Sequence, residues 1–186
     1  EIGESAFEKC TSLERITFAG SGLQQIGQKA FSSCKKLKYM ALPEGLEEIG
    51  DKAFLSSGIV FAEMPASLKR IGKSAYYNSK IKAVHLNQGL ESIGASAFET
   101  CYQLQGLRVP ASVAEVGSSF AGDNGSPFQW LLFENDAAVI GANPTDQMSI
   151  VYYGGEPSTI QEIYQKIYDK NNNTKLKFAN KESFES

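Results

Sequence analysis

Hydrophobic residues recur along this chain in a unit of fixed order, Ile-Gly-x-x-Ala-Phe, whose two variable positions are mostly polar. Full copies start at Ile2, Ile26, Ile49, Ile71 and Ile93, with Tyr76 in place of Phe in the fourth, and a degenerate copy starts at Val116. The starts are therefore 24, 23, 22, 22 and 23 residues apart. A steady period of this length is the signature of a repeat protein, in which each unit stacks on its neighbours.

Each copy continues with an alternation of apolar and variable residues that predicts a half-buried strand. The template is Leu-x-x-Ile-x-Leu-Pro, which is clearest at residues 37–43 and 104–110. A second extended piece follows, for example at residues 46–49 and 68–71, and Gly ends it with a turn. We expect Ala and Phe then to open a short helical segment. The pattern predicts one coil per repeat, with parallel strands about 4.8 Å apart. The Ile, Leu and Phe positions of successive repeats should form ladders in a shared core.

The complete unit, Ile-Gly-x-x-Ala-Phe-x-x-Cys-x-x-Leu-x-x-Ile-x-Leu-Pro, resembles the BspA-like, or treponemal-type, leucine-rich repeat over about residues 1–133. The segment at 152–155, Tyr-Tyr-Gly-Gly, followed by Ile160 and Ile163, also resembles a tail often seen after such arrays. The helix of that tail commonly contains Trp, whereas this one has Ile and Tyr. The resemblance implies an α/β repeat fold: a right-handed solenoid of 22–24-residue turns with short helical segments. It also implies bacterial (or protist) proteins, secreted or at the cell surface, that serve in adhesion and have no catalytic residues.

The regular unit breaks after Gly117, which divides the chain into two predicted parts. Residues 1–153 form the solenoid, regular to about 120 and irregular after it, with a turn-rich insertion at 121–127. Residues 154–186 form a cap and a polar tail. The apolar spacing of residues 158–170 predicts an amphipathic capping helix, and Leu176 with Phe178 predicts a last short strand. A solenoid needs such a cap over its final apolar layer.

Residues next to the inward positions of the predicted strands should face outward on the concave sheet. These outward positions carry several aromatic side chains, and exposed aromatic side chains are enriched at binding hot spots. The candidate binding residues are Tyr39, Phe61, His85, Arg108, Trp130, Leu132 and Tyr152. We expect Trp130, Leu132 and Tyr152 to form one apolar patch near the carboxyl end.

Cys10, Cys34 and Cys101 occupy the same slot of the repeat, three residues after the aromatic residue. The slot is predicted to face the coil interior, where a thiol packs as a small apolar group. Cys10 and Cys34 lie in adjacent turns, about 5 Å apart, so a disulfide is one alternative. The family resemblance favours the other, a buried reduced thiol.

No group of residues supports catalysis or metal binding. His85 is the sole histidine, and no Cys or carboxylate accompanies it at the spacing of a metal site or a catalytic triad. Asp123, Asn124 and Asp136 match no calcium-loop spacing, and a turn explains them better. No nucleotide-binding motif occurs. We expect no enzymatic activity, no metal and no cofactor.

The charge distribution does not favour nucleic acid as a partner, because the net charge is −3 and only Lys35, Lys36 and Lys38 cluster. No apolar run approaches the roughly 18 residues that cross a bilayer. The sequence begins partway through a repeat, which indicates a fragment whose export signal would lie upstream. The expected partner is a host or extracellular-matrix protein. A carbohydrate ligand and a passive spacer role are the alternatives.

Overall fold

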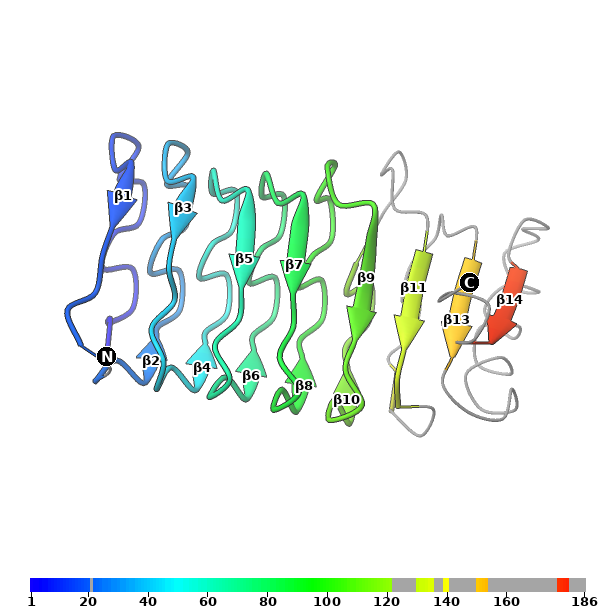
Figure 1. Cartoon of the computed structure of the whole chain (residues 1–186). Helices are drawn as coiled ribbons and strands as arrows, with labels where there is room; N and C mark the ends of the chain where they lie inside the picture. Colours follow the sequence, from blue (N-terminus) through cyan, green and yellow to red (C-terminus); the bar gives the residue numbers. More distant parts are fainter. Residues whose placement is uncertain (21, 122–129, 136–138, 141–149, 154–176, 181–186) are drawn as a thin grey trace.

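A computed structural model of the chain describes residues 1–20, 22–121, 130–135, 139–140, 150–153 and 177–180. These residues wind as a parallel-strand solenoid in which the repeats contribute strands to two rows (Figure 1). Row 1 consists of β1 (Arg15–Ile16), β3 (Tyr39–Met40), β5 (Phe61–Glu63), β7 (Ala83–His85), β9 (Gly106–Val109), β11 (Trp130–Phe133), β13 (Ile150–Tyr153) and β14 (Lys177–Asn180). Row 2 consists of β2 (Gln25–Ile26), β4 (Glu48–Ile49), β6 (Arg70–Ile71), β8 (Ser92–Ile93), β10 (Glu115–Val116) and β12 (Val139–Ile140).

Equivalent positions of successive repeats face one another in both rows, as the period predicts. In row 2 the first residue of each unit pairs in parallel with the same residue of the next, as Ile26 does with Ile49 and Ile49 with Ile71. In row 1, Arg15 pairs with Tyr39. Both predicted extended pieces of the repeat are therefore strands, and the predicted parallel register is confirmed.

The return segment after each Ile-Gly is a series of turns in the described coils, and the predicted short helix is wrong there. Residues with left-handed backbone recur four positions apart, such as Lys29 (φ 55°) and Ser33 (φ 61°), whereas an α-helix needs φ near −63°. The amide of Phe31, between them, donates to the carbonyl of Ala53 in the next coil at 2.8 Å, and alternate amides close turns within their own coil. Hydrogen bonds that a helix would form internally thus join neighbouring coils.

Aromatic side chains form a continuous stack inside the coils. Phe54 is only 1% exposed and lies between the rings of Phe31, with centroids 5.4 Å apart, and Tyr76, 4.9 Å apart. The stack extends to Phe7 on one side and Phe98 on the other, and neighbouring rings are within 14° of parallel. Burial raises the pKa of the Tyr76 phenol, so this ring stays neutral and packs as Phe does. The predicted ladder of the repeat is thereby confirmed.

The glycine of the unit is required for space. Gly50 donates its amide to the carbonyl of Ile26 at 2.8 Å, which draws the two coils together. A Cβ on Gly50 would lie 2.9 Å from the backbone nitrogen of Gln28 and 2.9 Å from the carbonyl carbon of Gly27. Real Cβ atoms do not approach backbone so closely, so a side chain at this position must push the coils apart.

The cysteine slot faces inward in two of its three copies. Cys34 and Cys101 are buried, and their thiols donate to the carbonyl oxygens of Phe7 (3.0 Å) and Tyr76 (3.1 Å). Cys10, in the coil of β1, is exposed, against the prediction. All three cysteines are free in the structure, which agrees with the reduced-thiol alternative. Burial raises the pKa of the Cys34 thiol.

The carboxyl-terminal strands extend row 1 beyond the regular repeats. Strand β11 pairs with both β9 and β13, and β14 pairs with β13, which agrees with the predicted last strand. The predicted capping helix at 158–170 lies outside the described residues, as do Asp123, Asn124, Asp136 and all of the predicted insertion at 121–127 except Ala121. The boundary between solenoid and cap at residue 153 stays a prediction.

Candidate binding face

The row-1 strands β3, β5, β7 and β9 alternate between the core and the exterior, as predicted. Met40, Ala62 and Leu107 are buried in the core. Tyr39 and Phe61, which the alternation places outward, are 61% and 46% exposed. We call this outward side of row 1 the row-1 face. It therefore presents two large aromatic side chains on neighbouring coils.

An apolar hollow of about 400 Å³ lies between these two aromatic side chains. Apolar side chains of β3, β5 and the loops after them form most of it, and two carboxylates add charge to its wall. Its lining consists of Tyr39, Met40, Ala41, Leu42, Glu44, Phe61, Glu63, Met64 and Pro65. The hollow suits an apolar side chain of a partner. A cation or a hydrogen-bond donor beside that side chain would complement the two carboxylates.

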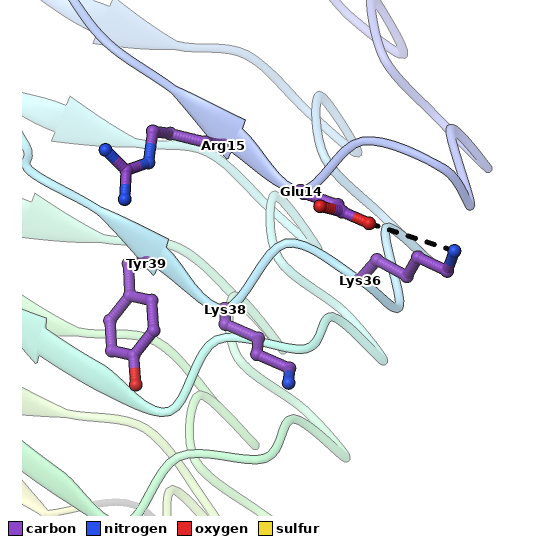
Figure 2. A pocket seen from close by; sticks show the side chains of 5 residues that line it. All are labelled: Glu14, Arg15, Lys36, Lys38 and Tyr39. Carbon is purple, nitrogen blue, oxygen red and sulfur yellow. Dashed lines mark ion pairs between the residues drawn. The ribbon is translucent and has the colours of Figure 1, made fainter.

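A second hollow, of about 440 Å³, adjoins the first because Tyr39 lines both. Its other residues are charged: Glu14 and Arg15 come from the coil of β1, and Lys36 and Lys38 come from the coil of β3 (Figure 2). Lys36 pairs with Glu14 across the coils at 3.9 Å, which leaves a net excess of two positive charges in the lining. This hollow suits an anionic group.

The two polar residues predicted for the face, His85 and Arg108, differ in the partners of their side chains. His85 is exposed in β7, beside Glu63 in register. Arg108 is also exposed, but its guanidinium is already paired: its Nε donates to Oε1 of Glu134 at 2.6 Å. Glu134 also accepts hydrogen bonds from the Gln88 side chain (2.9 Å) and the Ala111 amide (3.2 Å). Arg108 therefore holds neighbouring coils together.

The pKa of Glu134 predicts a loss of stability in acid. Burial alone would raise this pKa, but the hydrogen bonds from Gln88 and Arg108, the Arg108 charge and the Ala111 amide outweigh it, so the pKa lies below the usual 4.5. The ionised form thus stabilises the fold above that unfolded value, and this contribution is lost as pH falls through the lower folded pKa. We expect Glu134→Gln to reduce the free energy of unfolding by about 1–2 kcal/mol at pH 7 and by less at pH 3. Urea unfolding at pH 7 and at pH 3 measures the difference in free energy of unfolding between wild type and Glu134→Gln. The same difference at both pH values would contradict the prediction.

The predicted patch of Trp130, Leu132 and Tyr152 is not an exposed surface in the described part. Leu132 is fully buried, against the prediction. Leu132 pairs in register with Arg108 of β9. The Arg108 side chain binds Glu134, which follows Leu132 by two residues in the chain. Trp130 is half-buried, and the Tyr152 side chain lies outside the described residues.

Trp130 is half-buried because its indole ring lies against Gly106, the residue opposite it in β9. A Cβ at Gly106 would overlap the indole ring. We expect Gly106→Ala to displace the ring into water and shift the tryptophan fluorescence maximum to longer wavelength. The spectrum reports this ring directly, because Trp130 is the sole tryptophan. An unchanged maximum in folded Gly106→Ala would contradict this packing.

Sequence reasoning missed several residues of the two hollows. Arg15 and Glu63 stand at outward strand positions, as the candidates do, but neither was included among the candidate binding residues. Lys38 precedes β3 and had been assigned to a solvated cluster. Tyr102 was also missed: it is 51% exposed in the turn before β9, outside the row-1 strands, and nothing in the repeat marks it.

Two other kinds of site are absent from the part of the chain that the structure describes. No three His, Cys, Asp or Glu side chains come together there as a set of metal ligands. Within the same residues, no helix has the length and apolar character needed to cross a bilayer.

Comparison with solved structures identifies the fold. Structural similarity extends to a leucine-rich repeat protein from Bacteroides ovatus (TM-score 0.59, 20% identity), covering 96% of this chain and 58% of that one. A leucine-rich repeat protein from Eubacterium ventriosum matches 83% of this chain and 57% of its own (TM-score 0.54, 16% identity). The pneumococcal vaccine antigen PcpA matches 96% of this chain and 38% of its own (TM-score 0.55, 16% identity). The chain thus spans less than two thirds of each of these proteins.

The family follows from the repeats themselves. No curated protein sequence matches the chain. However, the BspA type leucine rich repeat region matches residues 1–124 in six copies, the same number as the Ile-Gly units found by spacing. Because this match covers most of the chain and the fold agrees with it, the chain belongs to the family of BspA-type leucine-rich repeats.

Proposed function

We propose that the chain is a non-catalytic protein-binding module of a bacterial surface or secreted protein, and that it binds its partner through the row-1 face. The observation that carries the proposal is the pair of exposed aromatic side chains, Tyr39 and Phe61, on adjacent coils around one apolar hollow. Exposed aromatics beside a recess are the commonest anchors of protein interfaces. Similarity to a vaccine antigen supports a place outside the cell.

The scaffold under the hollow favours tight binding. Tyr39 and Phe61 stand on strands whose inward neighbours, Met40 and Ala62, are buried in the core. Their backbone positions are therefore fixed before a partner arrives, so association loses little conformational entropy. We also propose that residues 154–186 cap this scaffold, since a solenoid end needs cover for its apolar layer.

A glycan-binding surface is the second candidate, because the exposed ring of Tyr39 has the geometry to stack on a sugar. Trp130, the second aromatic residue that could stack on a sugar ring, is half-buried against Gly106, which weakens this candidate relative to protein binding. A passive spacer would need no exposed aromatic pair at all. The three functions are separated by one set of variants.

The test compares wild type with Tyr39→Ala/Phe61→Ala and with Tyr102→Ala in binding to a panel of extracellular-matrix proteins and a glycan array. We expect the double variant to lose about 2 kcal/mol or more of binding free energy. Its melting temperature should stay close to that of wild type, since both side chains are exposed. Tyr102→Ala is the matched control, because it removes an equally exposed ring from outside the face.

Three results would contradict the protein-binding proposal. Equal losses in the double variant and in Tyr102→Ala would place the contact elsewhere. Binding confined to glycans would favour the second candidate. Wild-type protein that binds nothing on either panel would favour a spacer.

A further inference from the structure

The two hollows of the row-1 face form one continuous surface with a change of chemistry at Tyr39. On the side of β1, Arg15 and Lys38 line the charged hollow (Figure 2). On the side of β5, Phe61 lines the apolar hollow. Tyr39 belongs to both linings, so a ligand that fills one hollow touches the edge of the other.

The charges of the surface change sign along the same direction. The lining of the first hollow contains three cations and one carboxylate, and that carboxylate, Glu14, is paired with Lys36. In the second hollow the charged residues are Glu44 and Glu63. A group that fits the first hollow is therefore an anion, and an anion is disfavoured at the second.

The change in the sign of the charge between the two hollows favours a peptide over a polyanion as the ligand. A sulfated polysaccharide or a nucleic acid carries negative charge at every unit, so it would place anions beside Glu44 and Glu63. It also offers no aliphatic side chain for the hollow between Tyr39 and Phe61. A polypeptide can carry an acidic residue and an apolar residue next to each other, which matches both hollows.

The dimensions set the spacing of those two residues. The coils of β1, β3 and β5 are neighbours (Figure 1), so Arg15 and Phe61 are two strand spacings apart, roughly 10 Å. An extended peptide advances about 3.3 Å per residue. Two or three residues therefore span the distance between the charged and the apolar hollow.

From these observations we infer that the row-1 face binds an extended acidic peptide segment. Its carboxylate enters the charged hollow that Arg15 and Lys38 line, and an apolar side chain two or three residues away fills the hollow between Tyr39 and Phe61. The inference rests on the proposed function and names the chemistry of the partner. It assigns roles to Arg15 and Lys38 that the aromatic pair alone does not require.

The experiment measures binding of three short labelled peptides by fluorescence anisotropy. One has Glu and, two residues later, Phe in a Gly/Ser background; the second has Lys in place of Glu; the third has Ser in place of Phe. We expect the first to bind at least about tenfold more tightly than either other, with an affinity that falls as salt rises. Arg15→Glu/Lys38→Glu should remove that preference and reverse the salt dependence. The control, Lys80→Glu, changes one exposed charge outside both hollows.

Each other outcome overturns the inference in a distinguishable way. If the Glu and Lys peptides bind equally well to wild type, and Tyr39→Ala/Phe61→Ala binds neither, the ligand need not be acidic. The inference then fails, whereas the proposed function stands. Equal binding of the Glu peptides with and without Phe, together with tight binding of heparin, would replace the peptide with a polyanion. Absence of peptide binding by folded wild type at millimolar concentration would reject the peptide outright.

Discussion

Replacement of Phe54 by Ala is expected to reduce the free energy of unfolding by about 3–5 kcal/mol. Phe54 is the middle ring of the aromatic stack and is 1% exposed, with Phe31 and Tyr76 on its two faces. Its removal leaves a cavity that neither neighbour can fill, because each ring is held by its own coil. Since the coils share one core, the lost packing destabilises both neighbouring repeats.

Chemical denaturation of wild type, Phe54→Ala and Phe61→Ala measures this effect with a matched control. Both variants lose the same side chain within one repeat, but Phe61 is 46% exposed on the row-1 face. We expect Phe61→Ala to change the free energy of unfolding by less than about 1 kcal/mol. A loss below that value in Phe54→Ala would show that its ring is not part of a shared core.

Gly50→Val is expected to be the second most damaging change, at about 3 kcal/mol. The new Cβ would stand 2.9 Å from backbone atoms of Gln28 and Gly27, which cannot rotate away as a flexible side chain would. The coils must separate instead, and the 2.8 Å hydrogen bond from Gly50 to Ile26 weakens as they do.

Gly3→Val separates this explanation from a conformational one. Gly3 occupies the same slot of the first repeat, but a Cβ there meets nothing within 4 Å. If the slot needs glycine for space, Gly3→Val should be tolerated and Gly50→Val should lower the melting temperature markedly. Equal destabilisation by both substitutions would show that the turn itself demands glycine.

The period of the sequence was enough to predict the solenoid and most of its core. Because the side chains of a stacked coil are buried by equivalent residues of its neighbours, a strict repeat defines both the columns and their register. Ile26, Phe31 and Cys34 were placed in the core on this basis, and all three are fully buried. The outward placement of Tyr39 and Phe61 followed from the alternation of the strands.

The errors arose where coils interact in ways that the repeat does not encode. The segment after Gly27 looked helical because it joins two extended pieces, yet left-handed residues such as Ser33 turn its amides toward the next coil. Leu132 was expected on the surface but is fully buried, and its register partner Arg108 belongs to the neighbouring coil. The burial of such a position depends on neighbouring coils, which alternation within one strand cannot reveal.

The charged hollow was missed for a related reason. Arg15 and Lys38 belong to different repeats, and each is unremarkable as an exposed cation in its own strand. They become a site because the coils of β1 and β3 lie side by side and place both around Tyr39 (Figure 2). Charge at single positions is not part of the repeat, so only the stacked structure brings these side chains together.

Hydroxyl-radical footprinting of the folded protein, free and bound to a captured extracellular-matrix protein, tests the proposed binding face most directly. Tyr39, Phe61 and Tyr102 are all exposed, so each should be modified in the free protein. Binding through the row-1 face predicts strong protection of Tyr39 and Phe61 in the complex, with Tyr102 modified as before. Protection of Tyr102 alone, with Tyr39 and Phe61 still fully reactive, would contradict the account.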